Sequence, residues 1–140
     1  SLVSKKGFEA LDTLPAQDKK WMAPLPMDYD ANLPGYVKMI EMMGGHGGPN
    51  MPKAQASKDA TMAYFILQHF KPGSVFIHYN GAFHSENYDG INWYLKKQRP
   101  ELKYATITTV SQKNIKSLLA ENKGKADYII CVDADMTNTY

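Results

Sequence analysis

The segment 74–86 constrains the fold of this chain more than any other. It begins with a run of β-branched and aromatic residues at 75–79, which predicts a strand buried on both faces. An Asn-Gly turn signal at 80–81 ends the run, and His84 follows three residues later. Because open α/β sheets build their sites where strands end, we expect His84 at a site; the alternative is a solvated surface loop.

Two further β-rich runs, at 104–110 and 126–132, predict strands. Apolar residues at helical spacing predict helices at 88–98 and 114–122, between the strands. Alternating strands and helices favour a parallel sheet with right-handed crossovers. We therefore predict an α/β fold with a mostly parallel sheet flanked by helices.

The first half of the chain predicts helices and linkers and contributes no strand. Helical spacing occurs at 5–14, 33–43 and 52–70, and a proline-containing connection with apolar anchors spans 18–30. A three-stranded parallel sheet is small for 140 residues, and an apolar sheet edge is normally covered. We therefore expect an incomplete domain whose remaining strands come from another chain or from an amino-terminal half.

Composition narrows the classes of function. The formal net charge of +2 gives no reason to expect a nucleic-acid partner. Cys131 is the single cysteine, which excludes an internal disulfide. No apolar run approaches the ~20 residues that a membrane-spanning helix needs.

Two regions carry candidate ligands. On the long helix 52–70, Gln55 and Asp59 are polar positions on an otherwise apolar stripe, and Asp59 either complements the helix dipole or orients a nearby histidine. The glycine-rich stretch 44–50 surrounds His46, and methionines flank it. Methionine suits a flat apolar ligand and histidine is an iron ligand; the alternative is an ordinary loop whose methionines fill gaps in the core.

Three motifs together resemble a known family. They are AQASKDATMA at 54–63, VFIHYNGAFH at 75–84 and DGI at 89–91. This order resembles the second half of the ChaN-type haem-binding lipoproteins of the Tiki superfamily: an Ala-Gln-x-x-x-Asp-x-x-Met-Ala helix, a strand ending in Gly-x-x-His, and a Gly-Ile helix start. The stretch 3–11 also resembles the segment before the family's small helical insertion.

The resemblance implies that residues 1–140 are the carboxyl-terminal half of one ChaN/Tiki-like α/β domain, with 28–52 as a helical insertion and glycine-rich loop. It implies an iron-regulated, haem-binding protein of the cell envelope (periplasm or outer membrane) that takes part in haem and iron uptake. A lipid anchor outside this chain would be its only membrane attachment. The expected partners are haem, the missing amino-terminal half and a second copy in a homodimer.

The helical insertion would hold the haem. Its candidate haem-binding residues combine possible axial ligands with soft apolar side chains, and they are Tyr29, Tyr36, Met42, Met43 and His46.

Two alternatives stay open. The first is a metal-dependent hydrolase of the same superfamily, with His84 as base or divalent-metal ligand and Asp59 and Glu86 in support. The chain has neither a Gly-x-Ser-x-Gly elbow nor a close-spaced histidine pair, so a non-enzymatic role is favoured. The second is a non-catalytic structural or interaction domain in which His84 bonds Asp59 only to tie loop to helix.

Overall fold

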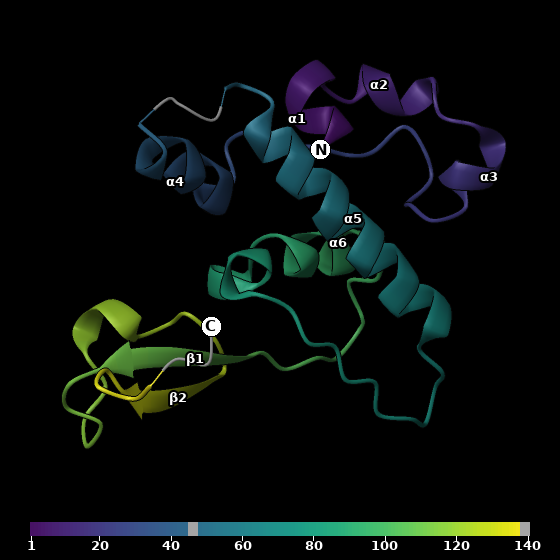
Figure 1. The fold of residues 1–140 in the computed structure, drawn as a ribbon. Helices are drawn as coiled ribbons and strands as arrows, with labels where there is room; N and C mark the ends of the chain where they lie inside the picture. Colours follow the sequence, from purple (N-terminus) through teal and green to yellow (C-terminus); the bar gives the residue numbers. More distant parts are fainter. Residues whose placement is uncertain (45–47, 138–140) are drawn as a thin grey trace.

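The computed structural model describes residues 1–44 and 48–137. Its helical part is arranged around the long helix α5, Met51–His69, and a small parallel sheet lies to one side (Figure 1). The other elements in chain order are α1 (Leu2–Lys6), α2 (Glu9–Asp12), α3 (Ala16–Lys19), α4 (Pro34–Met42), the 3₁₀ turns η1 (Ala82–His84) and η2 (Glu86–Tyr88), α6 (Ile91–Gln98), β1 (Ile107–Gln112), η3 (Ala120–Asn122) and β2 (Tyr128–Asp133). This combination of helices and parallel strands confirms the predicted α/β class.

Helix α5 is the packing centre because its buried face is made of small residues. Ala56, Ala60 and Ala63 are almost fully buried, and such small side chains let other helices approach closely. Helix α6 packs Ile91 and Tyr94 against this face, while α1 and α4 also contact α5. The predicted helices at 33–43, 52–70 and 88–98 are thus observed as α4, α5 and α6.

The predicted helix 5–14 is wrong because the chain breaks at Gly7. Gly7 has a φ of 77°, a value that L side chains rarely adopt, and it separates α1 from α2. Val3 and Leu11, on either side of the break, still pack into one core cluster with Ala54 of α5. The break therefore folds the amino-terminal segment back against α5.

Strands β1 and β2 pair in parallel, with Ile107 opposite Tyr128 and Gln112 opposite Asp133. The buried positions of β1 alternate, so one face is covered and the other is exposed. Within the described residues the sheet has these two strands, whereas the sequence predicts three.

The predicted helix 114–122 is also wrong. The amide of Gln112 donates to the backbone oxygens of Asn114 and Ser117, and Asn122 donates to its side-chain oxygen. The carboxamide oxygen of Asn114 also accepts from the backbone N–H of Lys116. Polar side chains that bond nearby backbone in this way compete with helix formation, and only the short η3 remains.

The largest difference between the predicted and the observed structure is at 75–79, where the sequence predicts a strand. In the described part of the chain this segment is not assigned to a strand, and no backbone hydrogen bond is found for residues 75–80. Val75, Ile77 and Tyr79 are 88%, 68% and 89% exposed. A strand forms only beside another strand, and none of the described residues lies in that position. Residues 75–80 are called the unpaired segment below.

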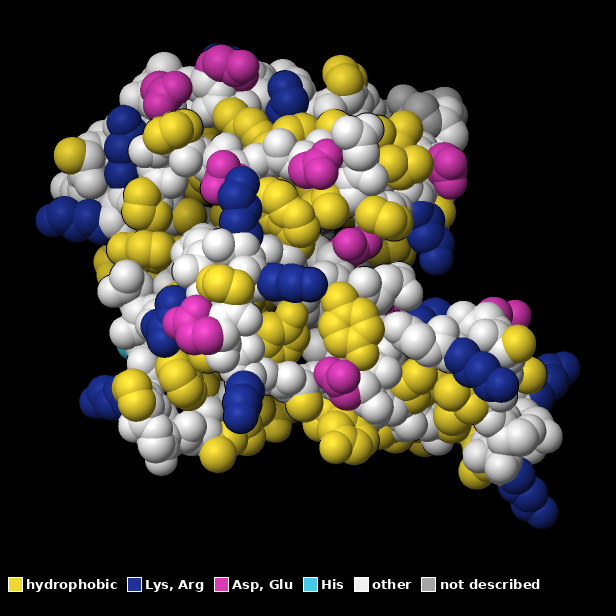
Figure 2. Space-filling model, turned by 180° about the vertical axis from the view of Figure 1, so that it is seen from behind, with side chains coloured by type: hydrophobic (Ala, Val, Ile, Leu, Met, Phe, Trp, Pro, Cys, Tyr) yellow, Lys and Arg dark blue, Asp and Glu magenta, His cyan; other side chains and the backbone are white. Residues whose placement is uncertain are grey.

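Apolar side chains are exposed over both parts of the molecule. Figure 2 shows them on the helical part and on the part below it, with Lys and Arg side chains scattered between. They include Phe76 near the start of the unpaired segment and Ile107 and Ile130 in the sheet. Of the helices in the described ranges, none has the length and apolar character needed to cross a bilayer.

Candidate functional site

A histidine and a buried carboxylate meet where η1 contacts α5. His84 ends η1, and its Nδ1 lies 2.5 Å from Oδ1 of Asp59. The Asp59 side chain is fully buried, whereas the His84 side chain is 21% exposed. The expectation that Asp59 orients a nearby histidine therefore matches the geometry. A carboxylate that accepts from Nδ1–H fixes the ring tautomer and leaves a lone pair on Nε2.

The second oxygen of Asp59 is bound to another helix. The hydroxyl of Tyr36, on α4, donates to Oδ2 of Asp59 at 2.9 Å, and Tyr36 is 3% exposed. Burial raises the pKa of the Asp59 carboxyl, and the hydrogen bonds from His84 and Tyr36 act in the opposite direction. Burial, and then the nearby Asp59, also raises the pKa of the Tyr36 hydroxyl far above its ordinary value.

Gln55 lies one turn before Asp59 on α5, against the same imidazole. Its amide nitrogen is 2.8 Å from Nδ1 of His84 and 3.5 Å from Nε2. Since Nδ1–H donates to Asp59, the Gln55 oxygen and not its nitrogen is the atom that suits the Nδ1 side of the ring. The longer contact to Nε2 is weak and leaves that nitrogen available.

Backbone packing holds these side chains in register. Gly90 has a φ of 55°, and a Cβ placed there would lie 2.4 Å from the backbone oxygen of His84 and 3.2 Å from Oδ2 of Asp59. The neighbouring Asp89 accepts from the backbone N–H of Gly35 at 2.8 Å, which ties the first turn of α4 to this loop. A glycine is therefore required at position 90, both because φ is positive there and because the backbone of His84 and the Asp59 side chain lie so close.

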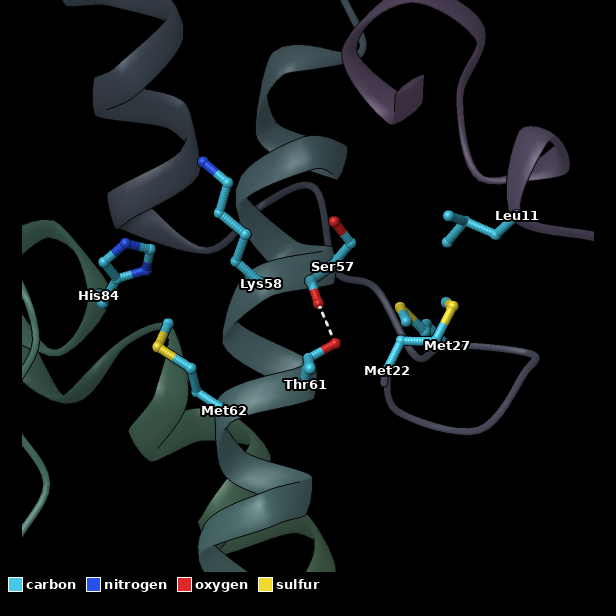
Figure 3. A pocket seen from close by; sticks show the side chains of 8 residues that line it. All are labelled: Leu11, Met22, Met27, Ser57, Lys58, Thr61, Met62 and His84. Atoms are coloured by element: carbon cyan, nitrogen blue, oxygen red, sulfur yellow. Dashed lines mark hydrogen bonds between the residues drawn. The ribbon is translucent and has the colours of Figure 1, made fainter. Parts of the chain in front are cut away.

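A groove of about 430 Å³ lies next to His84. Its lining is mainly apolar and methionine-rich, and the residues are Leu11, Met22, Met27, Ser57, Lys58, Thr61, Met62 and His84. Figure 3 shows His84, Lys58 and Met62 on one side of α5 and the other apolar side chains across it, so the groove runs over the exposed face of the helix. It is called the α5 groove below. Its size falls in the range of small-molecule sites, about 300–1,000 Å³.

The predicted haem-binding residues of 28–52 are spread over α4 and the chain before it. Tyr29 stacks on Tyr36, with ring centroids 5.8 Å apart, and the Tyr36 hydroxyl is engaged by Asp59. Met42 is 64% exposed and Met43 is half-buried. His46 lies outside the described residues. The structure thus groups Tyr29 with Tyr36 but does not bring either to the α5 groove, and their role as ligands stays a prediction.

Glu86 does not join His84 and Asp59. Its Oε1 accepts a long hydrogen bond of 3.5 Å from the Thr108 hydroxyl of β1, which directs it toward the sheet. In residues 1–44 and 48–137, no group of three or more His, Cys, Asp or Glu side chains is placed to hold a metal ion.

Of the eight residues that line the groove, sequence reasoning nominated only His84; the seven that it missed include Met22, Met27, Lys58 and Met62. Lys58 and Met62 are four positions apart on α5, on the side of the helix that faces the groove. That spacing is visible in the sequence. The contribution of Met22 and Met27 depends on how an irregular connection folds over α5, which no local pattern gives.

The fold and this geometry define an α/β protein in which a histidine, fixed by a buried carboxylate, lines a methionine-rich groove. The family model described as haem-binding uptake, Tiki superfamily, ChaN matches residues 1–95. The chain belongs to this family, as the three sequence motifs predict. No curated protein and no solved structure shows significant similarity to the chain.

Proposed function

We propose that this chain binds haem as the cargo of an uptake system, with the haem in the α5 groove and Nε2 of His84 as the iron ligand. The observation that carries the proposal is the His84 ring, whose Nδ1 is held by the buried Asp59 while its exposed part lines the groove. Histidines that bind metals typically donate their other ring N–H to a carboxylate in this way.

The residues of the groove fit haem chemically. The porphyrin is a flat apolar ring, which methionine and leucine side chains can contact closely. The porphyrin supplies the equatorial ligands of the iron, so one imidazole is enough on the protein side. Lys58 adds a cation for a propionate group.

Tyr36 is less suited to bind iron in this arrangement. A tyrosine ligand binds as the phenolate, and burial beside Asp59 raises the pKa of its hydroxyl and so opposes that form. Burial, and then the charge of Asp30, also raises the pKa of Tyr29. A haem held through the Tyr36 oxygen would have to open the Tyr36–Asp59 hydrogen bond first.

A haem titration followed in the Soret region tests the proposal. We expect saturable binding by the wild-type chain and by His69→Ala, which removes an exposed histidine at the end of α5. His84→Ala should shift the Soret band and weaken binding by more than about tenfold, because the partners of metal ligands alone contribute 10–100-fold.

Two results would contradict the proposal that His84 binds the haem iron. Unchanged binding by His84→Ala would move the iron to the 28–52 segment, where Tyr36→Phe and His46→Ala would then identify the ligand. A wild-type chain without a Soret band would remove haem as the ligand.

Lys58 gives a second prediction. Lys58→Met should weaken haem binding about two- to fivefold, as expected for an exposed ion pair, and should leave the affinity for haem dimethyl ester unchanged. Lys53→Met, on the same helix but outside the groove lining, is the matched control and should bind both ligands like wild type. Equal weakening for the acid and the ester would show that Lys58 does not contact a propionate.

A metal-dependent hydrolase is the second candidate, and the Asp59–His84 pair is the observation that favours it, since a carboxylate-bound imidazole is a suitable base. A divalent ion would need ligands besides these two side chains. Hydrolysis of a model ester or peptide with added Zn²⁺ or Mn²⁺, lost in His84→Ala and independent of haem, would favour the enzyme. The structural role alone would give neither activity nor a Soret band.

We also propose the cellular setting that the family suggests: a protein of the periplasm or outer membrane, produced under iron limitation, attached by a lipid anchor outside this chain and acting together with an amino-terminal half or a second copy. Fractionation of cells grown with and without an iron chelator checks the location and the regulation. Recovery in the cytoplasm, with a level independent of iron, would contradict both.

A further inference from the structure

We infer that Asp59 and Tyr36 are positioning residues that set the strength of His84 as an iron ligand. The inference rests on the haem binding proposed above. It assigns Tyr36 a role different from direct coordination, because its hydroxyl acts on the iron through Asp59 and the imidazole.

The three residues form one hydrogen-bonded chain across three segments. Tyr36 on α4 donates to Oδ2 of Asp59 at 2.9 Å, and Nδ1 of His84 lies 2.5 Å from Oδ1. Each carboxylate oxygen therefore has its own partner. Among the described residues, no buried side-chain nitrogen or oxygen lacks a hydrogen-bond partner. This chain of three is called the Tyr36–Asp59–His84 relay.

Burial makes the relay effective. Asp59 is fully buried and Tyr36 is 3% exposed, so water does not compete for the carboxylate. Gly90 packs against Oδ2 of Asp59 and the backbone of His84, closer than any residue with a Cβ would allow. In such surroundings each hydrogen bond is electrostatically stronger than in water.

The relay predicts opposite effects of Asp59 and Tyr36 on the imidazole. A charged acceptor at Nδ1–H increases electron density on the ring and strengthens the bond from Nε2 to iron. The Tyr36 hydroxyl withdraws part of the Asp59 charge by donating to it. Removing the carboxylate charge should weaken the iron–imidazole bond, and removing the tyrosine hydroxyl should strengthen it.

The experiment uses the haem complexes of wild type, Asp59→Asn and Tyr36→Phe. The readouts are the iron–histidine stretching frequency of the ferrous complex, by resonance Raman spectroscopy, and the haem dissociation constant. Asp59→Asn should lower the frequency and weaken binding about 10–100-fold. Tyr36→Phe should raise the frequency, with haem binding as tight as wild type or tighter.

Opposite directions distinguish tuning from simple damage, because a purely structural role would move both variants the same way. Shifts in one direction, or none, in a protein that still loses haem binding on His84→Ala would overturn the relay while leaving the proposed function intact. A wild-type chain without haem binding would overturn the proposed function and the relay together. If Asp59→Asn does not fold, the sign of the Tyr36→Phe shift decides alone.

Discussion

Asp59→Ala is expected to lower the free energy of unfolding by about 2–5 kcal/mol, because each of two hydrogen-bond donors left without its acceptor costs about 1–3 kcal/mol. The change leaves the buried Tyr36 hydroxyl and Nδ1–H of the partly buried His84 without their acceptor. Because domains are stabilised by about 5–15 kcal/mol in total, a large part of the stability would be lost. Urea denaturation followed by tryptophan fluorescence measures the change.

The matched control is Asp12→Ala, which removes an exposed carboxylate in α2. It should alter stability by less than about 0.5 kcal/mol, the usual range for surface changes. A loss below about 1 kcal/mol for Asp59→Ala would show that the relay contributes little to folding.

Gly90→Ala is the second large effect, with an expected loss of about 2–6 kcal/mol from overpacking and backbone strain together. The new Cβ would lie 2.4 Å from the backbone oxygen of His84, and backbone cannot move aside like a flexible side chain. Gly90 also has φ 55° and ψ −120°, a backbone conformation that residues with a Cβ rarely adopt. Because His84 must shift, haem binding should weaken too; thermal melts and the Soret titration report both effects.

Gly73→Ala separates backbone strain from overpacking as causes of the stability loss expected for Gly90→Ala. Gly73 has a φ of 81°, but nothing lies within 4 Å of its missing Cβ. It should therefore show only the cost of the left-handed backbone, about 1–2 kcal/mol, with normal haem affinity. Equal losses in the two variants would mean that the contact between Gly90 and His84 is not important.

The elements that could be predicted from the sequence are those whose signals are local. Helix α5 has a proline at its start and a long apolar stripe, so its position follows from the sequence itself. The strand at 75–79 could not be settled in this way, since pairing depends on neighbours distant in the chain. The helix predicted at 114–122 failed because Gln112 and Asn114 bind the backbone that a helix would have used.

In the candidate site, too, residues with a local sequence signal could be predicted and contacts between distant segments could not. Asp59 stands out as a polar residue on an apolar helix stripe, and His84 follows a turn, so both are visible in the sequence. The Tyr36–Asp59 hydrogen bond joins positions 23 residues apart and depends on how α4 docks on α5. No periodicity contains that information, and the sequence could only nominate Tyr36 as a ligand by its chemistry.

The unpaired segment has a practical consequence for work with the isolated chain. Among the described residues, its backbone N–H and C=O groups have no backbone partner, its side chains are largely exposed and apolar, and such a stretch is a template for intermolecular cross-β contacts. Self-association at high concentration would then originate from 75–80 and not from the α5 groove. Ile77→Lys would place a charge in this segment and should suppress such self-association, without changing any residue of the relay.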